Sequence, residues 1–274
     1  MKKTGNHVTL SGIVLIVIVA GFCLPHFVKF KNNVADNIQG NTEIAHEFEN
    51  LSTAMQTGNI FETSAASEQT ETSAVSEQTE ESLLNLEYTG QPAVAVNNNM
   101  PYFDDLSDTS FETYAELDGL GRTGTAFACI GRDLMPEGDR DFSLTVNPSG
   151  WKQAKYEEII DNGGWLYNRC HLIGWQLTGE EDNPENLMTG TRYFNIDGML
   201  DIENEVADYL TDYDVHVMYR VTPVYSGDDL LARGVLIEYM SVEDNGQLHG
   251  CYYVFNVQPG IKINYSTGES ERCE

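Results

Sequence analysis

The stretch Trp165-Leu-Tyr-Asn-Arg-Cys-His171 is followed, after a polar turn, by Tyr193-Phe-Asn-Ile-Asp-Gly-Met-Leu-Asp-Ile-Glu-Asn-Glu205. The first stretch is a short apolar run that favours a strand, and the second has apolar residues at helical spacing. The turn between them contains Asn183, Pro184 and Asn186, residue types that commonly end regular structure. The sequence therefore predicts a strand–loop–helix unit that carries polar side chains on each element.

Arg169 and His171 are two positions apart on the predicted strand, so their side chains point to the same face. A neutral histidine is a suitable base near pH 7, because its unperturbed pKa is about 6.5. An arginine on the same face could neutralise a phosphate. Taken alone, His171 is better explained as a structural histidine, and the residues downstream change that balance. Cys170 points to the face opposite His171, which argues against a cysteine nucleophile.

Asn195 and Glu203 are eight positions apart, just over two helical turns, so one helix can present both to one side. An asparagine carbonyl is a hard oxygen ligand that suits Mg²⁺, an ion that keeps most of its waters. Glu203 could orient those waters. Together with His171 and Arg169, these residues form the set that a one-metal phosphodiesterase needs. The alternative is that Asn195 caps the helix and Glu203 is solvated.

The rest of the C-terminal part predicts a mixed architecture. Alternating or apolar runs indicate strands at 126–130, 165–173, 215–224, 231–242 and 252–257, and helical spacing indicates helices at 151–161 and about 195–211. We therefore expect an α+β domain over residues 88–274 with a largely antiparallel sheet.

Residues 1–32 are predicted to form a membrane segment, since the run from Val8 to Val28 contains no Asp, Glu, Lys or Arg. About 20 apolar residues are enough to span a bilayer. Small residues that would mark a cleavage site are poorly placed, which favours an uncleaved transmembrane helix over a cleaved signal peptide. An uncleaved helix predicts a single-pass protein of the cell membrane whose C-terminal domain is extracellular, whereas cleavage predicts a secreted protein.

Residues 33–87 are predicted to form an acidic, disordered linker. They contain no Lys or Arg and include a nine-residue repeat, Thr63–Glu71 and Thr72–Glu80, whose copies differ only at Ala66 and Val75. Such a segment has too little apolar surface to offset the entropy of ordering. It is either a stalk that holds the C-terminal domain away from the membrane or merely a tolerated linker.

Acidic residues outnumber basic residues 43 to 15, for a formal net charge of −28. Nucleic-acid binders are ordinarily basic, so this balance argues against a tight, sequence-independent grip on DNA. It leaves room for an enzyme with a small local basic patch and a metal ion. The five cysteines lack zinc-site spacing, and disulfide pairing among Cys129, Cys170, Cys251 and Cys273 stays open.

Several motifs in the same order resemble those of the DNA/RNA non-specific endonucleases, the ββα-metal or His-Me finger nucleases. The chain looks most like the extracellular and phage-encoded DNases of streptococci. The usual Asp-Arg-Gly-His motif stands here as Asn168-Arg-Cys-His171, and the motifs at 117–128, 133–136 and 148–151 also resemble that group. The resemblance covers about 117–257. Asn in place of Asp at 168 and Cys in place of Gly at 170 are departures from the family pattern.

This resemblance implies a ββα-metal nuclease fold and a role for each matching residue. His171 would be the general base, and Asn195 would be the single protein ligand of Mg²⁺, for which Mn²⁺ could substitute. Glu203 would position waters on the metal, and Arg169 would orient the phosphate.

Four further residues are candidates for substrate binding or support of the site: Asn186, Arg122, Arg132 and Arg192. For each of the three arginines, a surface or ion-pair role is the alternative. The implied activity is endonucleolytic hydrolysis of DNA, with RNA as an open second substrate. A different class of function also fits, namely a surface-displayed module that binds nucleic acid or protein on the same fold after losing catalysis.

Overall fold

The computed structural model describes residues 79–140, 143–161 and 163–273. The predicted membrane segment, and the linker before residue 79, lie outside the described residues. Within the described part of the chain, no helix is both long and apolar enough to cross a membrane. All described residues fall in a single compact unit.

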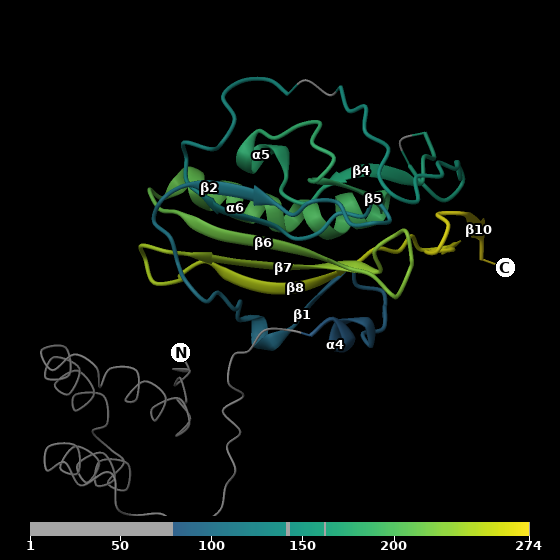
Figure 1. The fold of residues 1–274 in the computed structure, drawn as a ribbon, viewed down its shortest axis with the longest axis horizontal. Coiled ribbons are helices and arrows are strands. Elements are labelled where there is room, and N and C mark those ends of the chain that lie inside the picture. Colours follow the sequence, from purple (N-terminus) through teal and green to yellow (C-terminus); the bar gives the residue numbers. More distant parts are fainter. Residues whose placement is uncertain (1–78, 141–142, 162, 274) are drawn as a thin grey trace, which may run out of the picture. The chain divides into compact units, whose positions relative to one another are not determined.

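The centre of this unit is a six-stranded antiparallel sheet (Figure 1). Its strands are β1 (Ala93–Ala95), β2 (Phe111–Tyr114), β3 (Ala126–Ile130), β6 (Val217–Val224), β7 (Gly234–Ser241) and β8 (His249–Phe255). Their order across the sheet is β1-β8-β7-β6-β3-β2. The long strands β6, β7 and β8 are consecutive and pair as two hairpins, with Tyr219 opposite Tyr239 and Ile237 opposite Tyr252. The sheet therefore supplies a rigid floor for the elements that carry polar side chains.

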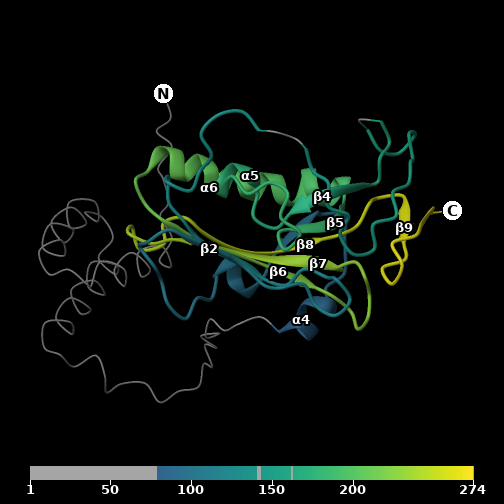
Figure 2. The same cartoon turned by 45° about the horizontal axis from the view of Figure 1, so that its top comes forward.

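One face of the sheet is covered by α6 (Leu200–Asp212), which continues without a break from the π-helical turn η3 (Phe194–Met199). Ile202, Val206 and Leu210 recur at helical spacing and are buried against alternate residues of the sheet. Figure 2 shows α6 lying along the strands on this face. Burial of this apolar stripe fixes which side of α6 faces away from the sheet.

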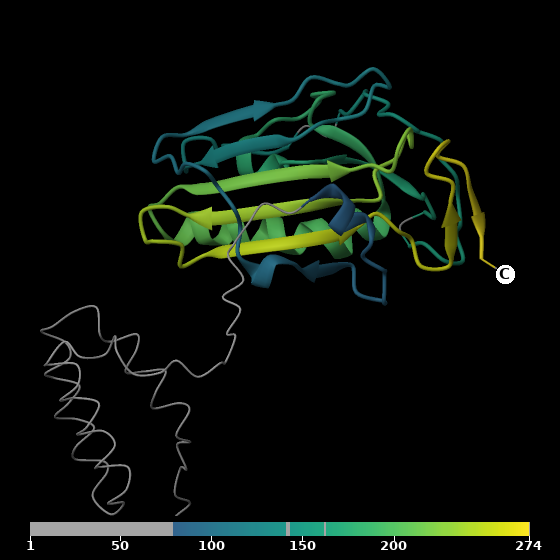
Figure 3. The same cartoon turned by 60° about the horizontal axis from the view of Figure 1, so that its bottom comes forward.

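The opposite face is covered by the first described residues. The short helix α4 (Glu80–Leu84) begins after Thr79, whose side chain accepts a hydrogen bond from the backbone N–H of Ser82. Leu83 is buried against Leu236 and Tyr253, and Figure 3 shows α4 on this side of the sheet. The packed unit therefore begins before residue 88, within the segment predicted as a linker.

A two-stranded ribbon lies on the same side of the sheet as α6. It consists of β4 (Tyr167–His171) and β5 (Leu187–Thr191), which pair in antiparallel register. The short helix α5 (Trp175–Thr178) lies between these two strands in the sequence. A third sheet, β9 (Ile261–Ile263) with β10 (Ser270–Arg272), closes the described chain. The ribbon and η3 bring together the two halves of the predicted strand–loop–helix unit.

The predicted strands are confirmed, and β3 has the expected bounds. The predicted helix over 151–161 is wrong, because the described residues there form no helix. Instead, Lys155 pairs with Trp165 in an isolated antiparallel bridge, and the Tyr156 N–H donates to the Gly164 carbonyl. Gly164 has a φ of +76°, which lets the chain reverse direction. Hydrogen bonds between the two adjacent segments then replace the bonds of a helix.

Candidate active site

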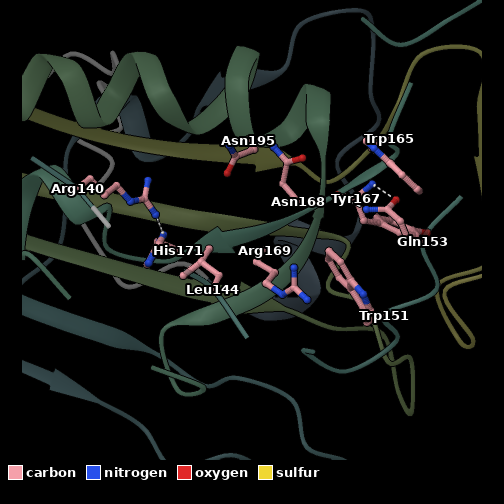
Figure 4. A pocket seen from close by; sticks show the side chains of 10 residues that line it. All are labelled: Arg140, Leu144, Trp151, Gln153, Trp165, Tyr167, Asn168, Arg169, His171 and Asn195. Carbon is pink, nitrogen blue, oxygen red and sulfur yellow. Dashed lines mark hydrogen bonds between the residues drawn. The ribbon is translucent and has the colours of Figure 1, made fainter. Parts of the chain in front are cut away.

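Arg169 and His171 lie on β4 and line one open cavity of about 570 Å³ (Figure 4). Because they are two positions apart on a strand, both side chains point away from the core, as the sequence predicts. The ten residues that line the cavity are Arg140, Leu144, Trp151, Gln153, Trp165, Tyr167, Asn168, Arg169, His171 and Asn195. Two arginines, a histidine and three amides thus meet in a space large enough for part of a polymer chain.

The ring of His171 is held by a backbone carbonyl. Its Nε2 lies 2.7 Å from the carbonyl oxygen of Glu181. A carbonyl oxygen can only accept, so Nε2 carries the hydrogen and donates. In the neutral ring the lone pair is then on Nδ1. The loop after α5 therefore orients the basic nitrogen of His171.

Burial keeps His171 neutral. The side chain is 7% exposed, and this burial lowers the pKa of His171. The Glu181 carbonyl acts in the opposite direction, while the charge of Arg140 lowers the pKa further. The net direction is downward, so the imidazole is a neutral base at pH 7.

Arg140 was not singled out by the sequence. Its Nη2 donates to His171 Nδ1 at 3.4 Å, and its guanidinium forms a two-point ion pair with the Glu181 carboxylate at 2.8 and 2.9 Å. Its guanidinium also lies 5.8 Å from the ring centroid of Trp175. Glu181 therefore holds both the arginine, through its carboxylate, and the histidine, through its carbonyl.

Arg169 is anchored on the other side of His171. Its Nε donates to the Val146 carbonyl, and Nη2 donates to Asn147 Oδ1 at 2.9 Å. The guanidinium lies over the ring of Trp151, 4.6 Å from the centroid. Among the described residues, no carboxylate lies within ion-pair distance of Arg169, so its charge remains available to an anion in the cavity.

The segment that carries Asn195 is a π-helical turn, in which the Leu200 N–H donates to the Asn195 carbonyl. In an α-helix eight residues advance about 800°, which overshoots two turns by about 80°. The i→i+5 hydrogen bond adds one residue to a turn, so two turns take about eight residues. Asn195 and Glu203 consequently line the same cavity of about 200 Å³. His171 and Arg140 also line it.

Glu203 is a buried carboxyl group. It is 9% exposed, and desolvation raises the pKa of Glu203 to about 7, while the charge of Arg140 acts in the opposite direction. The Glu203 carboxylate packs closely against the backbone of Gly174. A Cβ added at Gly174 would lie 2.7 Å from that carboxylate, so a larger residue there would displace it. At pH 7 a carboxyl group with this pKa is only partly ionised. A cation beside it would stabilise its charged form.

The residues present fit one divalent cation that keeps most of its waters. Within the described ranges, no hydrogen bond or ion pair engages the Asn195 amide or the Glu203 carboxylate. The same residues contain no group of three or more His, Cys, Asp or Glu side chains that could hold a metal. A cation here would take the amide oxygen as a direct ligand, which suits Mg²⁺ better than zinc.

A family model for the DNA/RNA non-specific endonucleases matches residues 104–243. This range is half of the chain and includes His171, Asn195 and Glu203. The chain belongs to this family. The family assignment predicted from the sequence motifs is thereby confirmed.

Two of the similar proteins come from streptococci. A protein of Streptococcus dysgalactiae subsp. equisimilis named deoxyribonuclease is 29% identical, and the match covers 57% of this chain and 59% of that protein. The chain thus spans about three-fifths of the length of this curated relative. NucA from Streptococcus agalactiae with a magnesium ion bound has a TM-score of 0.57 at 26% identity, covering 65% of this chain and 86% of NucA.

Two further structures show the same fold. NucA with no metal bound has a TM-score of 0.61 at 25% identity and covers 73% of this chain and 99% of that one. The Sda1 nuclease with a bound zinc ion has a TM-score of 0.52 at 30% identity, covering 60% of this chain and 82% of that one. The predicted α+β nuclease fold with a mostly antiparallel sheet is therefore confirmed.

The unusual cysteine in the motif of this endonuclease family member is accommodated by a glycine on the paired strand. Cys170 is fully buried, and a Cβ added at Gly190 would lie 2.5 Å from its Sγ. Burial raises the pKa of the Cys170 thiol well above its ordinary value. Cys170 is therefore a packing residue on the core face of β4, and the cysteine nucleophile is disfavoured as the sequence analysis expected.

Asn186 is not among the residues that line either cavity at His171. The side chain is fully buried, accepts from the Ile173 N–H at 2.9 Å and donates to the Ile173 carbonyl at 3.0 Å. These two bonds fix the chain directly after β4. Asn186 thus supports the site from behind, which was the other role expected of it.

The three candidate arginines outside the motif are also engaged elsewhere. Arg122 pairs with Asp118 and donates to the carbonyls of residues 227 and 229, and Arg132 donates to the carbonyls of residues 210 and 211 at the end of α6. Arg192 pairs with Asp161. None of the three lines either cavity at His171, which favours the ion-pair and surface roles.

Proposed function

We propose that this chain is an endonuclease that hydrolyses phosphodiester bonds of DNA without sequence preference and uses one Mg²⁺ ion, for which Mn²⁺ can substitute. The observation that carries the proposal is the orientation of His171, whose Nε2 donates to the Glu181 carbonyl and whose side chain lines a cavity shared with Arg140, Arg169 and Asn195. Membership of the DNA/RNA non-specific endonuclease family supports it. RNA is the second substrate class to be compared.

In the proposed reaction, His171 Nδ1 accepts a proton from a water molecule as that water attacks phosphorus. The bond from phosphorus to the leaving sugar oxygen breaks, and that oxygen takes up a proton from solvent. Arg169 and Arg140 neutralise the charge that accumulates on the phosphate oxygens. Arg169 is held by fixed partners. Arg140 stays on Glu181 but gives up its hydrogen bond to His171 Nδ1 when the attacking water takes that position.

Asn195 would hold the cation directly and Glu203 would orient its waters. When bound, the cation supplies positive charge beside the phosphate and lowers the barrier for the leaving oxygen. The buried carboxyl of Glu203 is well placed for this role, because a nearby cation would favour its ionised form.

We further propose that the activity operates outside the cell membrane, carried by the predicted membrane segment at 1–32. The length and apolar character of that sequence support this location. Protease added to intact cells would remove the C-terminal domain if the proposal is right. Protection of the domain until the cells are lysed would contradict it.

Cleavage of supercoiled plasmid tests the proposed activity. The full chain in detergent would be incubated with plasmid at low salt with Mg²⁺, beside EDTA, His171→Ala and the control His249→Ala. We expect loss of the supercoiled form with the wild type and the control, and none with EDTA or His171→Ala. No cleavage by folded wild-type protein with any divalent cation would overturn the proposal and favour a binding module.

A further inference from the structure

The end of the large cavity that lies away from His171 is built from aromatic side chains. Figure 4 shows Trp151, Trp165 and Tyr167 gathered on one side of Arg169, and His171 with Arg140 on the other. The ring centroids of Trp151 and Tyr167 are 6.4 Å apart. Trp151 holds Arg169, and Tyr167 is buried and donates to the Gly268 carbonyl, so Trp165 is the ring that the proposed reaction leaves without a role.

Trp165 is the most notable of them because it is 48% exposed. A large indole usually loses more of its surface to the core. Its ring carries Lys155 4.5 Å from the centroid, and its backbone pairs with that of Lys155. The indole is therefore fixed at both backbone and ring while half of its surface remains open to solvent and to the cavity.

Trp151 connects this aromatic end to the catalytic end. The guanidinium of Arg169 lies over its ring, and Arg169 is two residues from His171 on β4. The cavity therefore contains a cation, Arg169, and an exposed aromatic ring, Trp165. In proteins that bind single strands, cations contact the phosphate backbone and aromatic rings stack on the bases.

The charges of the molecule make such a surface necessary. Among the described residues, every Lys and Arg except Arg132 and Arg169 lies within ion-pair distance of a carboxylate. The chain as a whole carries a net charge of −28. Neutralisation of many phosphates, the usual source of sequence-independent affinity, is therefore weak here. Stacking of bases on aromatic rings is the other source that tolerates any sequence.

We propose that Trp165 forms a stacking subsite, in the cavity that it shares with Trp151, for an unpaired nucleobase of the polynucleotide whose phosphate lies at His171. This rests on the proposed function and specifies its substrate class. A base inside a duplex is already stacked on its neighbours and cannot enter without being unpaired. The subsite therefore favours single-stranded over double-stranded nucleic acid.

Trp165→Ala in the full chain tests the subsite, with Tyr213→Ala as the matched control. Tyr213 is an aromatic residue, 53% exposed, at the end of α6 and outside the cavity. On a labelled single-stranded oligonucleotide we expect Trp165→Ala to raise KM about tenfold with little change in kcat, since one stacked base contributes about that factor. Trp165→Phe should restore most of the affinity, and Tyr213→Ala should leave KM unchanged.

Two further substrates separate stacking from general damage to the site. Against a duplex of the same sequence, or a single strand with abasic positions around the cleavage site, Trp165→Ala should change KM less than twofold. An equal loss on all three substrates, or no loss on the single strand, would overturn the stacking subsite while leaving the nuclease proposal intact.

Binding in EDTA keeps the two proposals distinguishable. Fluorescence anisotropy of the labelled oligonucleotides reports affinity without cleavage. Binding of the single strand that depends on Trp165 would support the subsite even if no cleavage is found, in which case the nuclease proposal alone fails. Equal affinity of wild type and Trp165→Ala for the single strand would overturn the subsite.

Discussion

The Nε2 of His171 lies 2.7 Å from the carbonyl oxygen of Glu181, while the carboxylate of Glu181 holds Arg140 through three hydrogen bonds. Glu181 thus sets both the tautomer of His171, the proposed base, and the position of the Arg140 guanidinium beside it. The two groups come from segments 31 residues apart in the chain. A single loop residue therefore fixes both side chains, one through its carbonyl and the other through its carboxylate.

Glu203→Gln should stabilise the folded chain while abolishing cleavage. Burial raises the pKa of Glu203 from an ordinary 4.5 to about 7. Between these pH values the native state keeps a proton that the unfolded state releases, so the free energy of unfolding falls as pH rises from 4.5 to about 7. In EDTA at pH 8, the variant should therefore have the higher Tm, and the difference should vanish below pH 4.5.

The control is Asp208→Asn, an exposed carboxylate on the same helix. It should leave both Tm and cleavage nearly unchanged. A Tm of Glu203→Gln at or below that of the wild type at pH 8 would show that the buried carboxyl is not a cost to the fold.

Asn195→Ala should weaken metal binding specifically. If its amide oxygen is the direct protein ligand, the Mg²⁺ concentration needed for half-maximal cleavage should rise at least tenfold, a loss of about 1.4 kcal/mol. The rise in Tm that Mg²⁺ causes in the wild type should shrink in parallel. Asn204→Ala is the matched control, because Asn204 is an exposed neighbour that only accepts from Gln176 at 3.2 Å. Equal Mg²⁺ requirements for the two variants would contradict the assignment.

Tyr219→Phe and Tyr239→Phe should change stability in opposite directions. The Tyr219 hydroxyl is buried with no hydrogen-bond partner among the described residues, whereas the Tyr239 hydroxyl donates to Glu205 at 2.6 Å. Removing the unpaired hydroxyl should stabilise the chain by about 1 kcal/mol, and removing the paired one should cost about 1 kcal/mol. Urea unfolding measures both. A loss of stability in Tyr219→Phe would mean that this hydroxyl has a partner.

Much of the fold is visible in the sequence because the packed elements repeat with a simple period. The alternation along β6 and β7 and the spacing of Ile202, Val206 and Leu210 follow from burial on one side. The segment 151–161 also has helical spacing, but the backbone of Ala154 and Tyr156 bonds to Leu166 and Gly164 instead. A pattern of apolar positions cannot show that a neighbouring segment will compete for the same hydrogen bonds.

The site divides in the same way. Arg169 and His171 could be selected because they lie two positions apart on a strand, and Asn195 and Glu203 because they lie about two helical turns apart. The π-helical turn that aligns the second pair could not be predicted from the spacing. Arg140 could not, because it lies in an irregular loop and is brought to His171 only by the fold. The sequence signal that remains for such a residue is weak: it is one of few basic residues in a strongly acidic domain.

The central claim is that His171 acts as the base through Nδ1. This nitrogen carries the lone pair because Nε2 donates to the Glu181 carbonyl. Its most direct test is cleavage by His171→Ala with and without added imidazole, in Mg²⁺. We predict a loss of activity of about 10³-fold, within the range for removal of a general base, and partial recovery as imidazole increases. The recovery should follow the neutral form of imidazole as pH changes. Full activity in His171→Ala, or a loss that imidazole never restores in a folded variant with normal affinity for Mg²⁺, would contradict the account.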